Sequence, residues 1–193
     1  MDKKPRRPFG RRGFSFFGPA ASRHREPPAR NAAGFSVIEL GIVLAVSMLV
    51  GVVGVSAYRT YAVRTQVSAG ILQAEHVQAR VVAAFRRIGE APADRTQAGM
   101  PGPASDDAGE LVAGIEVVDG RLAIVFGGRA DSVIAGRTLY LTPFETADLE
   151  VVWVCGNKVP GVGLHPMGFA GGGRAATQLL TVIDARYLPS SCR

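Results

Sequence analysis

The sequence has few of the residues from which enzyme and metal sites are built. Its 193 residues include three histidines and two cysteines, and His24, His76 and His165 show none of the repeated spacing typical of metal ligands. A Gly-x-Ser-x-Gly elbow and the Gly-Lys-Ser/Thr end of a phosphate-binding loop are also missing. The single tryptophan, Trp153, lies in a β-like run and is expected in the core. We therefore predict no catalytic site, no metal and no cofactor.

Charge is nearly absent from one long segment. The 23 residues from Phe35 to Ala57 carry no charged side chain except Glu39. As a helix they would rise about 35 Å, enough to span the hydrocarbon core of a bilayer. An acid at the bilayer centre costs about 2.5 to 3.5 kcal/mol and less toward the interface, so an acid kept in such a run is by default a functional residue. The alternative is a membrane anchor with an incidental Glu.

The positive charge of the chain is concentrated at its beginning. Residues 1–34 hold nine Lys or Arg and two acids, a balance of +7, so the other 159 residues carry −1 of the chain's net +6. Positive charge before an apolar run places that side in the cytoplasm. The Pro, Gly and Arg content of this segment cannot bury a core, so disorder is expected. We predict a basic leader at 1–34 that stays in the cytoplasm and is removed.

The junction between the leader and the apolar run reads Gly34-Phe35-Ser36-Val37-Ile38-Glu39-Leu40. It closely resembles the processing site of a type IV prepilin, in which a prepilin peptidase cleaves after the Gly and methylates the new N-terminal Phe. In that family the Glu pairs with the N-terminus of a neighbouring subunit during assembly. The resemblance implies cleavage between Gly34 and Phe35, N-methylation of Phe35 and an assembly role for Glu39. The leader is much longer than those of the commonest pilin class.

Beyond the apolar run the sequence becomes amphipathic. Apolar residues recur every three or four positions from Val63 to Ile88, which is the period of a helix with one buried face. We expect one helix over about 35–88, stopped by Gly89 and Pro92. Its first half is apolar all round and needs lipid or other helices, whereas its second half needs a globular partner.

The rest of the chain predicts a loop followed by strands. Residues 89–110 contain three prolines and no periodicity, which is typical of a loop. The hairpin signal Asp119-Gly120 joins the first two of the β-like runs. These runs lie at 111–118, 121–126, 138–141 and 149–154. The order of long helix, loop and meandering strands favours an α+β fold, with about four antiparallel strands packed on one face of the amphipathic half-helix.

The only two cysteines, Cys155 and Cys192, enclose 36 residues. Because an exported location is oxidising, we predict a disulfide between them, worth roughly 3 to 4 kcal/mol on the chain-entropy model. Two free buried thiols are the alternative. Trp153-Val154-Cys155 and the stretch from Tyr187 to Arg193 also look like the last strand and C-terminal loop of type IVa pilins.

A glycine-rich segment, residues 161–174, lies between the cysteines. It lacks the residues of a phosphate-binding loop, so we expect a flexible surface loop bounded by the disulfide. The charged residues of the enclosed region and its end give +3: Lys158, Arg174, Arg186 and Arg193 against Asp184. A weak contact with nucleic acid is an alternative to a merely solvated surface.

These features predict a type IVa-like major pilin, a structural subunit with a leader at 1–34, a transmembrane and filament-core half-helix at 35–57 and an extracellular domain at 58–193. The resemblance implies partners: copies of the chain itself, the prepilin peptidase, and an inner-membrane assembly platform with its ATPase. It also implies a role in adhesion, twitching motility or DNA uptake.

Two alternatives stay open from the sequence. One is a minor pilin or a pseudopilin of a type II secretion system. The other is a soluble secreted domain behind an ordinary signal peptide, since Val55-Ser56-Ala57 resembles a signal-peptidase site. The length of the apolar run and the presence of Glu39 argue against the second alternative.

Overall fold

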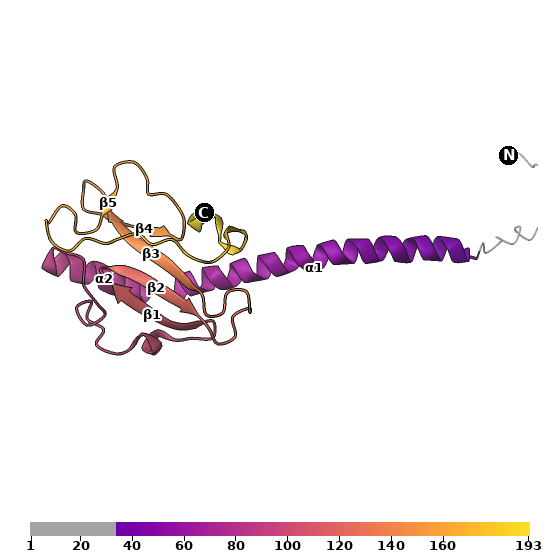
Figure 1. Cartoon of the computed structure of the whole chain (residues 1–193), viewed down its shortest axis with the longest axis horizontal. Coiled ribbons are helices and arrows are strands. Elements are labelled where there is room, and N and C mark those ends of the chain that lie inside the picture. The colour runs from indigo at the N-terminus through magenta and orange to yellow at the C-terminus, as the bar shows by residue number, and fades with distance from the viewer. Residues whose placement is uncertain (1–33) are drawn as a thin grey trace, which may run out of the picture. The chain divides into compact units, whose positions relative to one another are not determined.

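A computed structural model describes residues 34–193. These residues form two α-helices, α1 (Val37–Gln73) and α2 (Glu75–Ile88), followed by the strands β1 to β5 (Figure 1). Three short 3-10 helices complete the described part: η1 (Ala104–Asp107), η2 (Ala185–Tyr187) and η3 (Ser190–Cys192). The predicted α+β fold is confirmed. The predicted leader lies outside the described residues, apart from Gly34.

The helical run extends almost as far as its apolar pattern predicts, but one residue interrupts it. Ala74 separates α1 from α2, and its N–H approaches the carbonyls of both Gly70 (3.2 Å) and Ile71 (3.0 Å). α2 ends at Gly89, whose φ of 76° is left-handed and whose N–H donates to the Phe85 carbonyl. A glycine suits this position because it has no Cβ to clash there. The interruption at Ala74 was not predicted.

The strands form an antiparallel sheet in the order β1-β2-β3-β4. Their bounds are Val112–Val118, Arg121–Phe126, Thr138–Glu145 and Val151–Cys155. Asp119 and Gly120, with φ of 49° and 73°, make the predicted turn between β1 and β2, since both central residues of such a hairpin turn need positive φ. β3 extends beyond its predicted end at 141, whereas β4 begins later than predicted, at 151 instead of 149, and ends one residue later, at 155.

A fifth strand, β5 (His165–Pro166), escaped prediction because it is two residues long. It pairs with Phe144 and Glu145 of β3. β4 pairs with the same two residues, so β5 must occupy the opposite edge of β3, beyond the end of β2. In this way the sheet takes up part of the glycine-rich region.

The core lies between the sheet and the helical residues from 63 to 85. The helix contributes Val63, Val67, Ala74, Val77, Val81 and Phe85, all buried as their spacing predicted. The sheet contributes Ile115, Leu122, Ile124, Phe126, Leu139 and Leu141. Gly70 permits the close approach: a Cβ there would lie 2.7 Å from Cε1 of Phe126. Trp153 is half-buried and packs against this core.

Candidate functional site

The first candidate site is the apolar half of the helical run. Every residue from 34 to 59 is exposed, including Phe35 at 79% and Val52 at 73%. The helical run from Val37 to Ile88 is long and apolar enough to cross a membrane. Contiguous apolar surface of this extent marks a membrane or protein contact, because keeping it in water costs about 25 cal/mol per Å². This half therefore needs lipid or other helices as its partner.

The predicted processing and assembly residues lie at the start of this half. Gly34, Phe35 and Ser36 precede the helix, and Glu39 is in its first turn with its side chain exposed. An acid in the first turn complements the partial positive charge of a helix N-terminus. Cleavage at Gly34, methylation of Phe35 and the assembly role of Glu39 stay predictions.

The disulfide between Cys155 and Cys192 is present, as predicted, with the two Cα atoms 4.5 Å apart. It joins the end of β4 to η3, and both cysteines are buried. The Asn157 N–H also donates to the Cys192 carbonyl. The last residues of the chain are thus fixed against the sheet, and the segment between the cysteines becomes a closed loop.

The glycine-rich part of that loop is tethered by two carboxylates. Buried Glu145 accepts hydrogen bonds from the N–H groups of Gly168 (3.4 Å) and Ala170 (3.0 Å). Glu90 accepts one from the Arg174 N–H (3.0 Å). Backbone N–H groups that could hold a phosphate are therefore already used by anions of the chain. The loop is at the surface as predicted, but these contacts restrain it.

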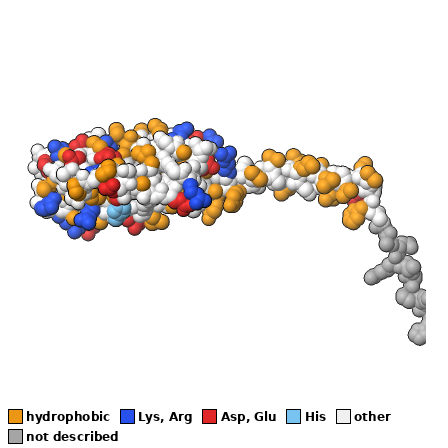
Figure 2. All heavy atoms as spheres, turned by 90° about the horizontal axis from the view of Figure 1, so that it is seen from below, with side chains coloured by type: hydrophobic (Ala, Val, Ile, Leu, Met, Phe, Trp, Pro, Cys, Tyr) orange, Lys and Arg blue, Asp and Glu red, His pale blue; other side chains and the backbone are white. Residues whose placement is uncertain are grey.

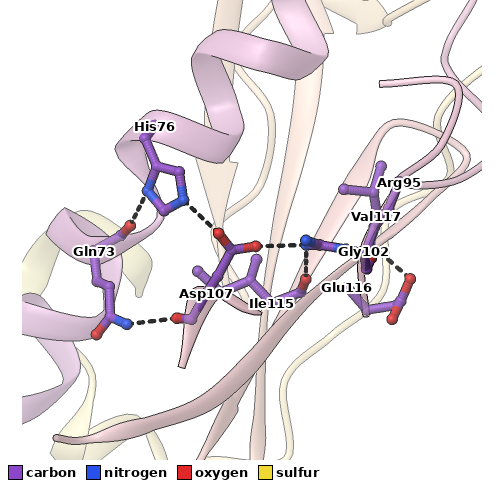
Figure 3. Close-up of polar contacts among 8 residues, drawn as sticks. All are labelled: Gln73, His76, Arg95, Gly102, Asp107, Ile115, Glu116 and Val117. Carbon is purple, nitrogen blue, oxygen red and sulfur yellow. Dashed lines mark hydrogen bonds and ion pairs between the residues drawn. The ribbon is translucent and has the colours of Figure 1, made fainter. Parts of the chain in front are cut away.

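A second polar cluster joins the helix interruption to the loop before β1 (Figure 3). The two ring nitrogens of His76 lie 2.6 Å from Oδ1 of Asp107 and 2.8 Å from the Gln73 carbonyl. Arg95 donates from Nη1 to Oδ2 of Asp107 (2.6 Å) and to the Ile115 carbonyl (2.6 Å). No sequence pattern predicted this cluster, because Arg95 and Asp107 lie in the loop without periodicity and meet the helix only in the folded domain.

Asp107 is the electrostatic centre of the cluster. Partial burial raises its pKa, but the hydrogen bonds from His76 and Arg95, together with their charge, outweigh burial and hold the pKa below its ordinary value. Arg95 is only 6% exposed, so Asp107 is the counterion that makes its burial tolerable. The cluster fixes a loop against the helix, and its groups are occupied with one another.

The remaining polar groups of the described residues make local contacts. Within residues 34–193, no group of three or more His, Cys, Asp or Glu side chains could hold a metal ion. His165 stacks on Phe169 with ring centroids 5.2 Å apart. Two cations of the disulfide loop are paired, Arg174 with Asp119 at 3.1 Å and Arg186 with Asp184 at 2.9 Å. The weak contact with nucleic acid stays an alternative for this region.

A surface cavity of about 410 Å³ lies beside the end of α2. Phe85, Arg86, Leu149 and the tethering residue Glu145 line it together with the glycine-rich loop. The Glu145 carboxylate is already bonded to two backbone N–H groups of that loop. Its role is therefore to fix the glycine-rich loop as one wall of the cavity.

Comparisons with known proteins agree with the resemblance found in the sequence. The family model for pilin, a bacterial filament protein, matches residues 63–193. A type IV major pilin protein PilE1 of Neisseria gonorrhoeae is 33% identical over 161 residues, covering 83% of this chain and 93% of that protein. A fimbrial protein of Neisseria meningitidis serogroup A is 32% identical over 167 residues, with the same coverage. The fimbrial protein EcpC of Eikenella corrodens is 28% identical over 160 residues, covering 83% and 90%.

Proposed function

The chain belongs to the pilin family of bacterial filament proteins, and on this premise we propose that it is the major subunit of a type IV pilus. The observation that supports this proposal best is the exposed apolar helix from 37 to 57, followed by residues whose apolar face is buried in a core of their own. A chain of this kind folds its domain alone but cannot cover its first half. Many copies packed through that half would form a filament with the domains on its outside.

Before assembly, the same half-helix would lie in the inner membrane. Residues 35–57 are long enough to span it, and the basic leader would keep the N-terminus in the cytoplasm. The prepilin peptidase would then cleave between Gly34 and Phe35 and methylate the new terminus, and an assembly platform with its ATPase would extract the subunit.

Glu39 would act during docking of a new subunit. Its carboxylate is the single charge in the span, so an incoming chain gains by placing it beside the Phe35 ammonium group of another copy. At about 4 Å and an effective dielectric constant near 20, such a pair is worth about 4 kcal/mol before the cost of desolvation is subtracted. This attraction would set the register between neighbouring helices.

Mass spectrometry of surface-sheared filaments tests the proposal. We expect a mature chain that begins at N-methylated Phe35 and forms the bulk of the filament. A mature terminus at Tyr58 would support the soluble secreted domain and overturn the filament role. A correctly processed chain found only in trace amounts among other pilins would instead make it a minor pilin.

The pilin family is a family of structural proteins, and we expect no enzymatic activity from this chain. Adhesion, twitching motility and DNA uptake are roles of the whole filament. Assays of adhesion, twitching motility and DNA uptake on cells that lack the gene would separate these roles. The assembly surface cannot separate them, because a subunit buries it equally in all three.

A further inference from the structure

The domain has a ring of arginines at the end where the helix enters it. We call Arg59, Arg64, Arg129, Arg137 and Arg186 the basic collar. Figure 2 shows Lys and Arg side chains at this end of the domain, and others at the opposite end. The collar combines two helix residues with residues from the segment between β2 and β3 and from η2.

Contacts to the helix fix the position of the collar along the helix axis. Arg59 Nη2 lies 3.5 Å from Asp131 Oδ1, and Gln66 Oε1 accepts from the Asp131 N–H at 2.8 Å. Both contacts hold the segment between β2 and β3 against the helix. On the C-terminal side, Arg64 Nε donates to the Arg186 carbonyl at 2.7 Å, and Arg137 donates to the Val182 carbonyl at 2.8 Å.

The collar begins where the apolar run ends. Ala57 is the last residue of that run, and seven residues of helix place Arg64 about 10 Å farther along the axis. The headgroup layer is about 5 to 8 Å thick on each side of the hydrocarbon core. Tyr58 and Tyr61, exposed by 72% and 69%, are the aromatic residues expected at such an interface. In a membrane-spanning chain the collar would therefore lie at or just above the headgroups.

The collar carries net positive charge, although the domain as a whole is neutral. Residues 58–193 contain 13 Lys or Arg and 13 acids, so they have no net charge. The five collar arginines and their three neighbouring acids, Glu110, Asp131 and Asp184, leave +2 at this end. The rest of the domain therefore carries −2. In a membrane-spanning chain, the part of the domain nearest the bilayer would therefore carry a net positive charge.

From this placement we propose that the basic collar docks on the anionic phospholipid headgroups of the membrane that the chain spans before assembly. The proposal rests on the membrane stage of the proposed function. Each arginine close to an anionic surface is attracted to it, and guanidinium groups bind phosphate in bidentate fashion. The docked collar would limit the tilt of the subunit. Acidic side chains of another copy are the competing occupant, but only the membrane is within reach of the collar in an isolated subunit.

Paramagnetic relaxation in lipid nanodiscs tests the collar. The full-length chain is placed at one copy per disc, in phosphatidylcholine with or without phosphatidylglycerol, with a gadolinium-chelating lipid in every disc. We expect amides of residues 127–137 and 184–187 to relax at least about twofold faster in the anionic discs. High salt should remove the difference, because it screens exposed charges. Equal relaxation in the two lipids would overturn the proposal.

Two matched triple variants separate the collar from charge in general. The collar variant carries Arg129→Gln, Arg137→Gln and Arg186→Gln, and the control carries Arg80→Gln, Arg86→Gln and Arg87→Gln on α2, where all three arginines are exposed. Each loses three positive charges. The lipid effect should vanish in the collar variant and persist in the control. Loss of the lipid effect in both variants would assign it to net charge. A lipid effect that appears only with two copies per disc would assign it to contact between copies. Either result would overturn membrane docking.

Protease protection in sealed vesicles tests separately whether the chain spans a membrane before assembly. A spanning chain leaves its leader and its domain on opposite sides, so only one of them is digested from outside. A chain with both ends on one side would overturn the membrane stage and with it the collar. A spanning chain without a lipid effect would overturn the collar alone.

Discussion

Residues 43–59 and residues 63–88 belong to one nearly continuous helical run, yet they behave as two different kinds of structure. The first stretch has no buried residue, whereas the second places a residue in the core at almost every turn. The backbone is helical in both. The difference comes from the side chains: apolar residues on all sides in one stretch, and a single apolar stripe with polar flanks in the other.

The two stretches therefore gain their stability from different partners. The stripe from Val63 to Phe85 is satisfied inside the chain by the sheet, so it contributes to folding. The apolar half gains nothing from folding and can gain only from lipid or from other copies. Changes in the two halves should therefore separate cleanly, one affecting assembly and the other affecting stability of the domain.

The largest effect should come from Glu39→Ala in the apolar half. Surface filaments should fall about tenfold or more, because a pairing worth about 4 kcal/mol before desolvation is lost. The domain should stay folded and disulfide-bonded, since Glu39 lies outside its core. Filaments are counted by electron microscopy at matched subunit levels. Ser47→Ala is the control, because the Ser47 hydroxyl bonds within its own helix, to the Val43 carbonyl at 2.7 Å. Normal filament numbers in Glu39→Ala cells would rule out the assembly role.

Removing the disulfide should give the largest change within the domain. We expect Cys192→Ser to lower the free energy of unfolding by about 2 to 5 kcal/mol, because the loop then closes without a covalent link. Denaturant unfolding of the full-length chain in detergent measures it. Ser190→Ala, at an exposed neighbouring position, should have little effect. Thiol reagents that label both cysteines in the native protein would contradict the prediction.

A pair of glycine substitutions compares the two halves directly. Gly70→Ala should destabilise the domain by about 1 to 3 kcal/mol, because overpacking displaces a core ring. The ring is that of Phe126, which the new methyl group would meet. Gly51→Ala meets nothing within 4 Å and should leave domain stability unchanged. Equal losses of unfolding free energy in the two variants would show that the halves are not separate in their energetics.

The smallest effect should be a change in acid sensitivity. Since the pKa of Asp107 is lowered by folding, its stabilisation is complete above its unfolded value near 3.9 and is lost as the pH falls through its lower folded value. Asp107→Asn should cost about 1 to 2 kcal/mol at neutral pH and flatten the acid side of the stability curve. Unfolding free energies measured at several pH values test this. The exposed neighbour offers the control Asp106→Asn, and an unchanged acid slope in Asp107→Asn would refute the assignment.

Features that depend on neighbouring residues could be predicted from the sequence alone. The length of the apolar run, the spacing from Val63 to Phe85 and the hairpin turn at Asp119-Gly120 are all local patterns, and the structure bears out the helix and the turn. The disulfide could also be predicted from the sequence, because two cysteines allow only one pair. The junction from Gly34 to Leu40 pointed to the pilin family, which the comparisons confirm.

The contacts that hold the irregular segments in place became visible only in the folded structure. Glu145 bonds to backbone 23 and 25 residues away, Glu90 to backbone 84 residues away, and His76 to a carboxylate 31 residues away. The interruption at Ala74 and the two-residue strand β5 belong to the same class. Such contacts have no period and no turn signature, because distant segments meet only after the helix and sheet have packed. A sequence pattern indicates the local structure that neighbouring residues favour. These contacts instead depend on which distant groups the packing of helix and sheet brings together.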